Sequence, residues 1–208
     1  MTRDSRGFTL IEVLLAISLM AILLILVGAA LTATRKTLAS TERFTQRLDE
    51  VRAAQQFLRR EFQQIVPLPI DIDASGTAAV FHGEASEMRY VASLPPHLGG
   101  GLYVQTLRLG NRETDPWLEV SFTQLGGANG GQPWGEPQRL LGQVQGLRFT
   151  YRGLDTQGRP SGWLPRWPWP QRLPQAIDVT LASQGPIAWP PLRVALRLQP
   201  QSAQVPSL

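Results

Sequence analysis

The feature that most constrains this chain is a long apolar run close to its N-terminus. From Phe8 to Thr34 the only ionisable side chain is Glu12. A run of more than about 18 apolar residues is long enough to cross a bilayer as one helix. A carboxylate in such a segment costs about 2.5–3.5 kcal/mol at the helix centre and less near the interface, where Glu12 would lie. The sequence therefore predicts one membrane-spanning helix that tolerates an acidic residue near its N-terminal end.

The residues before this run distinguish it from an ordinary secretory signal peptide, whose apolar region is shorter and is followed by a small-residue cleavage site. Here Arg3 and Arg6 are followed directly by Gly7 and Phe8. Because Gly7 has no side chain, it offers a protease an unobstructed peptide bond. The string Arg-Gly-Phe-Thr-Leu-Ile-Glu that ends at Glu12 resembles the N-terminus of the type IV prepilins and of the type II secretion pseudopilins.

This resemblance implies that the prepilin peptidase cuts after Gly7 and N-methylates Phe8, and that Glu12 is the assembly carboxylate. Cleavage would place the new α-amino group of Phe8 at the same depth as Glu12. When helices stack with an axial offset, the carboxylate of one subunit can meet the amine of a neighbour, which offsets the cost of burying each charge and fixes the register. A solvated carboxylate at the level of the lipid headgroups is the alternative interpretation of Glu12.

Composition limits what the rest of the chain can be. A chain of 208 residues with one membrane helix leaves enough sequence for one soluble domain of ordinary size. The chain has no cysteine, which excludes a disulfide framework, a thiol nucleophile and a cysteine metal site. Its formal net charge of +4 comes mainly from arginines that are spread along the chain and mixed with acids, so nucleic-acid binding is not expected.

Residues 35–66 are predicted to continue the helix beyond the membrane, until Pro67 and Pro69 stop it. Apolar residues recur there at steps of three and four, which places them on one face, and charged residues are expected on the other faces. The apolar face is more consistent with packing on a sheet than with a coiled coil, which is the competing interpretation. The apolar positions are Phe44, Leu48, Val51, Ala54, Leu58, Phe62 and Ile65, and the charged ones are Arg43, Arg47, Asp49, Glu50, Arg52, Arg59 and Glu61.

From Thr77 onward the period changes to two, as in an antiparallel sheet with one covered face. The clearest alternation lies at residues 87–92, 118–123, 147–152, 177–181 and 192–198, and weaker candidates are Ala78–His82, Tyr103–Leu109 and Pro137–Leu141. The glycine runs at residues 99–101 and 126–131 are predicted to be turns, since they lack the lysine and the strand-helix context of a phosphate-binding loop. The expected fold class is α+β, a pilin-like fold in which a long N-terminal helix packs on a mostly antiparallel sheet. The expected divisions are a leader at 1–7, a transmembrane assembly helix at 8–34, its amphipathic half at 35–66, a β-rich periplasmic domain at 67–200 and a tail at 201–208.

A loop rich in tryptophan, proline and arginine follows Gly158. Tryptophan and arginine are favoured in the centres of protein interfaces, but tryptophans in a long loop also fold back to cover a small core. The default expectation is a core cover, and a partner interface is the alternative. The residues concerned are Trp163, Arg166, Trp167 and Trp169.

The end of the helix and the C-terminal strands refine the resemblance. Residues 47–51, 57–62 and 64–69 resemble the end of the helix in the J-type minor pseudopilin of type II secretion. The C-terminal layout resembles it too, through residues 144–151, Gly162 with Trp163, Trp167 and residues 173–177. That resemblance implies a single-pass inner-membrane subunit with a short cytoplasmic leader and a periplasmic domain. It also implies a place in the tip complex of the pseudopilus with I-type and K-type subunits, alongside the major pseudopilin.

Two other functions are considered. A minor pilin of a type IV pilus or competence system would share the N-terminus and nearly the same fold. A membrane-tethered enzyme or ligand-binding domain would need converging titratable groups, but His82 and His97 have no neighbours at metal-ligand spacing. The acid pairs Glu84 with Glu87 and Asp71 with Asp73 are expected to be solvated surface charge. No catalytic residue, cofactor or metal site is therefore expected.

Overall fold

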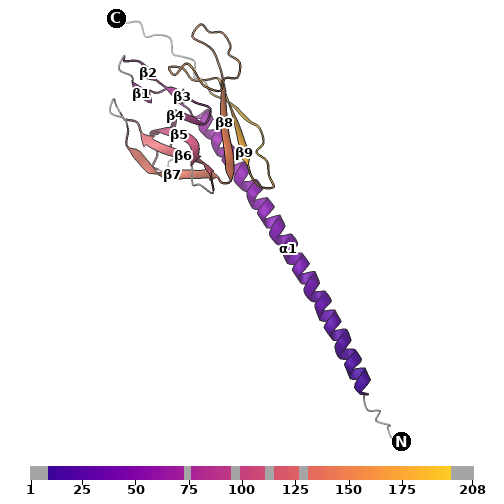
Figure 1. Cartoon of the computed structure of the whole chain (residues 1–208). Helices are drawn as coiled ribbons and strands as arrows, with labels where there is room; N and C mark the ends of the chain where they lie inside the picture. The colour runs from indigo at the N-terminus through magenta and orange to yellow at the C-terminus, as the bar shows by residue number, and fades with distance from the viewer. Residues whose placement is uncertain (1–8, 73–75, 95–98, 111–114, 127–130, 198–208) are drawn as a thin grey trace, which may run out of the picture. The chain divides into compact units, whose positions relative to one another are not determined.

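One helix passes through both compact units of the chain. The computed structural model describes residues 9–72, 76–94, 99–110, 115–126 and 131–197, without the side chains of residues 32–40. Its two compact units are Met1–Gln46 and Arg47–Leu208. The helix, α1, runs from Leu10 to Gln63 and is 54 residues long (Figure 1).

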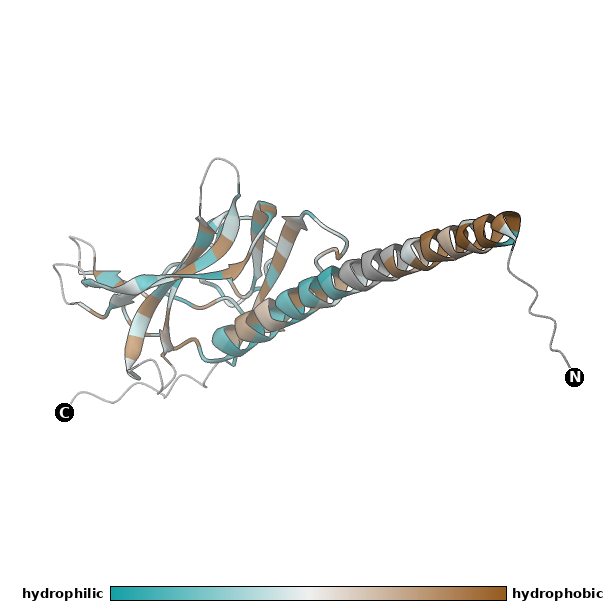
Figure 2. Cartoon of the chain, turned by 90° about the horizontal axis from the view of Figure 1, so that it is seen from below, coloured by the Kyte–Doolittle hydropathy of each residue, from teal (hydrophilic) through white to brown (hydrophobic). Residues whose placement is uncertain are grey.

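The N-terminal part of α1 has the composition of a membrane span. Leu10–Leu31, a segment of 22 residues, is long and apolar enough to cross a bilayer, and none of it is buried within the protein. Figure 2 shows this part of the helix as hydrophobic around its circumference, whereas the part that belongs to the second unit alternates between polar and apolar positions. These features confirm the predicted apolar helix and its position in the chain.

The helix ends three residues earlier than the sequence predicts. We expected it to continue to Val66, but α1 ends at Gln63. The residue before a proline is disfavoured in the helical conformation, and Val66 precedes Pro67. The amide of Val66 donates instead to the carbonyl of Val91 in a neighbouring strand, at 2.9 Å. The end of the helix is therefore set by proline and by the bridge that Val66 forms with Val91 of the sheet.

The described residues of the second unit form three antiparallel sheets (Figure 1). Five strands form the largest sheet in the order β3-β4-β5-β6-β7, three form a second sheet in the order β10-β9-β8, and β1 pairs with β2. The strands are β1 (Asp71–Ile72), β2 (Ala78–Ala79), β3 (Phe81–Gly83), β4 (Glu87–Ser93), β5 (Leu102–Gly110), β6 (Trp117–Gln124), β7 (Pro133–Leu141), β8 (Val144–Arg152), β9 (Ala176–Ser183) and β10 (Leu192–Ala195).

One hydrophobic cluster joins the helix to both larger sheets. From α1 it takes Val51, Ala54, Leu58 and Phe62, and these pack with the inward-facing residues of β4 to β6 and of β8 to β10. At about 25 cal/mol per Å² of buried apolar surface, such a cluster is the main source of stability in a chain without disulfides. The predicted apolar face of the helix is thereby confirmed at these positions.

The prediction for the rest of the helix surface needs correction at three residues. Arg47 and Glu61 were expected on solvent-facing sides of the helix, but their exposed fractions are 7% and 2%. Both find polar partners, in Gly142 for Arg47 and Gln105 for Glu61, although the buried Nε of Arg47 has none among the described residues. Phe44 was expected on the buried face, but it is 46% exposed because it precedes the part of the helix that packs on the sheets.

A strand that the sequence indicates only weakly lies at the centre of the largest sheet. β5 pairs with β4 through residues 102–108 and with β6 through residues 103–110. Its alternation is interrupted because Gln105, a polar residue, is fully buried. The other two weak candidates also correspond to strands, β2 with β3 and β7.

Candidate assembly site

Glu12 lies in the first turn of α1, and its side chain is exposed. The backbone amides of Glu12 and Val13 donate to the carbonyl of Thr9, at 3.0 and 3.3 Å. Thr9 and Glu12 have the spacing of a capping box, in which the acidic residue reaches back to the start of the helix. A carboxylate in the first turn also interacts favourably with the positive end of the helix dipole. Glu12 thus has a local reason to be where it is, and an experiment on assembly must separate that role from an intermolecular one.

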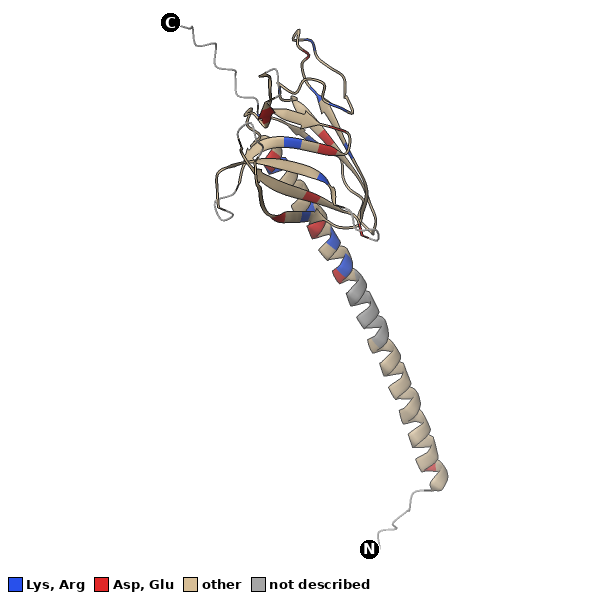
Figure 3. Cartoon of the chain, turned by 60° about the vertical axis from the view of Figure 1, so that its left-hand side comes forward, with Lys and Arg blue, Asp and Glu red and all other residues tan. Residues whose placement is uncertain are grey.

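The two predicted processing residues, Gly7 and Phe8, lie outside the described residues. Glu12 is the acidic residue of the apolar segment Leu10–Leu31, and Figure 3 shows acidic colour near the N-terminal end of the helix. Within the described part of this segment Glu12 is therefore the charge that would need a partner when apolar helices pack side by side.

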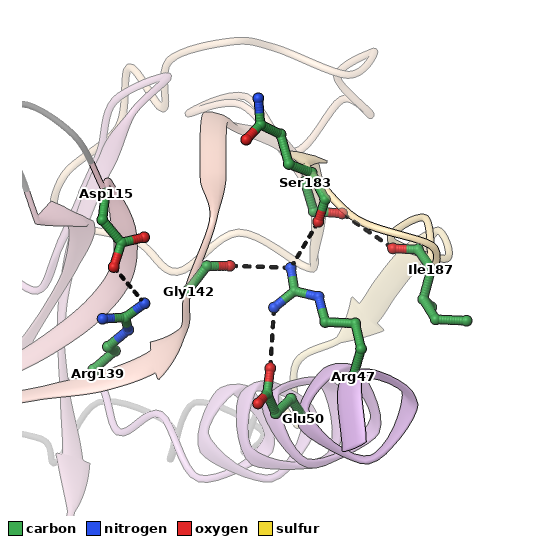
Figure 4. Close-up of polar contacts among 8 residues, drawn as sticks. Arg47, Glu50, Asp115, Arg139, Gly142, Ser183 and Ile187 are labelled. Carbon is green, nitrogen blue, oxygen red and sulfur yellow. Dashed lines mark hydrogen bonds and ion pairs between the residues drawn. The ribbon is translucent and has the colours of Figure 1, made fainter. Parts of the chain in front are cut away.

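Arg47 attaches the helix to two loops of the second unit (Figure 4). Its guanidinium contacts the carboxylate of Glu50 at 3.1 Å and donates to the carbonyl of Gly142 at 3.0 Å and to that of Gln184 at 3.4 Å. Gly142 follows β7, and Gln184 follows β9. The amide of Gln184 also donates to the carbonyl of Gln143, at 2.9 Å. One side chain thereby ties the helix to the ends of both larger sheets.

A buried polar chain crosses from the helix to the largest sheet. The amide nitrogen of Gln105 donates to Glu61 Oε2 at 2.8 Å, and the hydroxyl of Tyr90 donates to Gln105 Oε1 at 3.2 Å. Burial raises the pKa of Glu61, and the hydrogen bond from Gln105 and the charge of Arg60 only partly oppose this. Burial, followed by the negative charge of Glu61, raises the pKa of Tyr90 well above its usual value. This chain aligns the helix with β4 and β5, at the cost of a desolvated carboxyl group.

The tryptophans of the loop after Gly158 have different surroundings. Trp167 is 4% exposed, and its indole N–H donates to the carbonyl of Arg172 at 2.7 Å. Its ring packs edge-on against that of Trp169, with the two ring centroids 4.8 Å apart. Trp169 is half-buried against the main cluster. These two rings cover the core, which is the default that the sequence suggested. Trp167 is therefore buried and is not available to contact a partner directly.

The other two residues of this set are accessible. Trp163 is 37% exposed, and its ring lies 5.5 Å from the guanidinium carbon of Arg193 on β10. Arg166 is exposed and pairs with Glu84 at 2.9 Å. The alternative interpretation, a partner interface, stays open for Trp163 and Arg166.

Among the described residues, no group of three or more His, Cys, Asp or Glu side chains could hold a metal ion. His82 Nε2 lies within hydrogen-bond distance of Asp71, at 3.2 Å, and Asp71 also pairs with Arg89 at 3.9 Å, so these residues form polar contacts at the surface. His97 and Asp73, which the sequence also brought into consideration, lie outside the described residues.

Sequence reasoning missed the structural roles of Arg47, Glu61 and Gln105. A helical projection places Glu61 three residues from Leu58 and next to Phe62, at the border of the apolar face. That position was a signal that its carboxylate could turn inward. The identity of its partner could not be read from the sequence, since Gln105 is 44 positions away.

Comparison with known proteins gives two family matches and one curated relative. Residues 29–188 match a family model described as type II secretion system (T2SS), protein J, and residues 2–28 match the prokaryotic N-terminal methylation motif. A curated protein of Xanthomonas campestris pv. campestris, named type II secretion system protein J, is 38% identical over 204 residues. The match covers 94% of this chain and 93% of the relative. The two family models together span α1 and most of the β-rich unit.

Proposed function

The chain belongs to the type II secretion system protein J family, and from this membership we propose how it acts as a minor pseudopilin. Members of this family are structural subunits of a secretion system, which interact with other pseudopilin subunits. The observation that carries the proposal is the family match over residues 29–188, because it includes the strands β1 to β9 and the junction with the helix. The N-terminal motif alone would be equally consistent with a minor pilin of a type IV pilus.

The first step we propose is processing and insertion. The prepilin peptidase cleaves after Gly7 on the cytoplasmic side and methylates Phe8, and the apolar helix anchors the subunit in the inner membrane with a single pass. The match of residues 2–28 to the N-terminal methylation motif supports this step. The β-rich unit would then lie in the periplasm, where a chain without cysteine needs no disulfide chemistry.

The second step is assembly. In low dielectric, the carboxylate of Glu12 pairs with the terminal amine of Phe8 on a neighbouring helix, which fixes the axial offset between subunits. The exposure of Glu12 and the apolar composition of Leu10–Leu31 support this geometry. The β-rich unit selects the partners, which we propose to be the I-type and K-type minor subunits at the pseudopilus tip and the major pseudopilin.

Co-purification of the full chain with tagged I-type and K-type subunits, from membranes dissolved in mild detergent, tests this function. Glu12→Ala and Glu12→Gln separate the two roles of the residue, because glutamine can replace glutamate in a capping box but carries no charge. We expect both variants to reduce the recovered complex about tenfold or more, since removing one member of a buried ion pair costs about 3–5 kcal/mol.

Two results would contradict parts of this proposal. If only Glu12→Ala lowered recovery, the residue would act by starting the helix, and the register step would be wrong. If the unsubstituted chain formed no complex with either subunit, its place in the tip complex would be wrong.

A further inference from the structure

The outward face of the three-stranded sheet carries an unusual concentration of arginine. The inward residues of β8, β9 and β10, such as Phe149, Val179 and Val194, belong to the core. The outward residues of β9, the central strand, have small or short side chains: Ala176, Asp178, Thr180 and Ala182. The two flanking strands and the residues that follow β10 present exposed arginines, which together we call the arginine face: Arg148, Arg152, Arg193 and Arg197.

The strand register staggers these arginines. Arg148 is opposite Thr180 and Arg152 is opposite Ala176, whereas Arg193 is opposite Asp178, which lies between those two positions on β9. Four residues along a strand span about 13 Å, and two strands are separated by roughly 10 Å across the intervening one. The amide of Leu196 donates to the carbonyl of Gln175 at 2.9 Å, so the alternation continues to Arg197. The guanidinium groups are therefore spread over a wide surface.

Most of this positive charge has no acidic partner. Arg193 pairs with Asp178 at 2.8 Å, but Arg148, Arg152 and Arg197 make no ion pair with any residue that the structure describes. The five-stranded sheet differs, because its arginines on β4, β5 and β7 pair with Asp71, Glu119 and Asp115. The excess of positive charge is thus a local property of one sheet.

An ordered aromatic residue lies within the same face. The ring of Trp163 lies 5.5 Å from the guanidinium carbon of Arg193, whose Nε is held by Asp178. The cation–π contact and the ion pair restrict the side chains before any partner arrives, which lowers the entropy lost on binding. Tryptophan and arginine are also the residues most enriched among those that dominate binding energy.

We propose that the arginine face binds an acidic segment of a partner protein, with Trp163 and Arg193 at the centre and Arg148, Arg152 and Arg197 around them. A guanidinium group donates two parallel hydrogen bonds to a carboxylate, and the separation of these arginines matches carboxylates about 10–13 Å apart. The carboxylate of Asp178 at the centre favours a protein partner over a membrane or a nucleic acid. A membrane surface or a nucleic acid presents a continuous array of phosphates, and these would be repelled by that carboxylate. This inference rests on the proposed function, in which the β-rich unit selects partners.

A binding experiment with a defined probe tests the inference. The full chain in neutral phosphatidylcholine nanodiscs is titrated against a fluorescein-labelled peptide of alternating glutamate and serine, and fluorescence anisotropy is measured at low and high salt. The matched peptide contains glutamine in place of glutamate. The variant Arg148→Gln/Arg152→Gln/Arg197→Gln is compared with Arg43→Gln/Arg52→Gln/Arg59→Gln, which removes the same charge from exposed positions of α1.

We expect the parent chain to bind the glutamate peptide and not the glutamine peptide, with affinity that falls as salt rises. The arginine-face variant should bind about tenfold more weakly, since each exposed ion pair contributes roughly 1.4-fold to fivefold. The helix variant should differ from the parent by less than about twofold, because it leaves the arginine face intact. Equal thermal unfolding of the two variants would show that the loss is not a loss of fold.

Equal peptide affinity of the two variants would overturn the proposal. So would a face variant that kept its peptide affinity but lost binding to vesicles of phosphatidylglycerol and phosphatidylcholine, because the face would then recognise a membrane. The proposed function is tested separately, by co-purification of the unsubstituted chain with I-type and K-type subunits. The failure of one proposal can therefore be distinguished from the failure of the other.

Discussion

At the scale of single residues, two buried glutamates of the second unit show how surroundings change what a carboxylate does. Glu61 and Glu119 are both at most 5% exposed. Glu61 accepts one hydrogen bond from the neutral Gln105, whereas Glu119 accepts from the charged Arg108 and from the indole of Trp117, each at 3.0 Å. A charged donor compensates a buried carboxylate far better than a neutral one. The two residues should therefore respond in opposite directions to the same substitution.

We predict that Glu61→Gln raises the free energy of unfolding at pH 7 by about 1 kcal/mol, the usual size of a single-substitution effect. The raised pKa of Glu61 means that its carboxyl binds a proton more readily in the folded state. Binding of this proton stabilises the folded state, and the contribution is fully present below the unfolded pKa of Glu61, near 4.5. The contribution is lost as the pH rises through the folded pKa, because the carboxyl then loses its proton. The gain from glutamine should shrink as the pH falls toward 4. Urea titrations of the full chain in detergent, followed by near-ultraviolet circular dichroism, measure it.

Glu119→Gln is the matched control for this prediction. It should lower the free energy of unfolding by about 1–3 kcal/mol, because Arg108 and Trp117 lose a charged acceptor. A stability gain for Glu61→Gln that did not change between pH 4 and pH 7 would contradict the role assigned to the carboxyl proton.

At the scale of elements, α1 was the most predictable part of the chain and its attachment the least. Its apolar span and the stripe from Val51 to Phe62 follow from composition and period, and the structure confirms both. The end at Gln63 was missed by three residues, since it depends on a bridge between Val66 and Val91 that period alone does not show. Similarly, β5 was indicated only weakly, because the buried Gln105 interrupts its alternation. A polar residue that is buried against a partner far away in the sequence breaks the hydrophobic period. Such residues make secondary structure hard to predict where two elements meet.

Arg47 is the element-scale test of how the helix is attached. We predict that Arg47→Met lowers the free energy of unfolding by about 2–3 kcal/mol, because the carbonyls of Gly142 and Gln184 lose the donor they share. Arg47→Lys should cost about 1 kcal/mol, since an ammonium group can replace some of the hydrogen bonds but lacks the planar fork. The same urea titration measures both effects.

Arg43→Met, one turn earlier and exposed, is the control and should change stability by less than about 0.5 kcal/mol. Hydrogen exchange at the amide of Gln184, which donates to Gln143, would report loosening of the loops in Arg47→Met. Unchanged exchange at this amide would mean that Arg47 does not hold the two loops together.

At the scale of the whole molecule, the N-terminal processing and assembly segment could be predicted from the sequence, whereas the arginine face could not. The segment from Gly7 to Glu12 is a local string, so its resemblance to prepilins was visible without a structure. The arginine face joins Arg148 and Arg152 of β8 to Arg193 of β10, and their staggered arrangement depends on a register that the sequence does not state. In the sequence the arginines are spread along the chain and mixed with acids. Only strand pairing shows that several of them share one surface.

The last prediction concerns the covalent state of the whole chain. Gly7→Val places a branched side chain beside the bond that we expect the prepilin peptidase to cut, so the purified variant should keep residues 1–7. The parent should begin at a methylated Phe8, and Ser5→Ala, a control within the leader, should be processed like the parent. Intact-mass spectrometry of the chain purified from membranes distinguishes these outcomes. A Gly7→Val chain that began at Phe8 would contradict the predicted cleavage site.

The same variant tests whether cleavage supplies the partner of Glu12. Without cleavage there is no α-amino group on Phe8, so the ion pair cannot form even though the carboxylate of Glu12 is still present. Gly7→Val should therefore reduce co-purification with I-type and K-type subunits about as much as Glu12→Gln does. The double variant should show no further loss, because residues that form one pair are not additive. If the two losses multiplied instead, Glu12 would act in assembly through some group other than the new N-terminus.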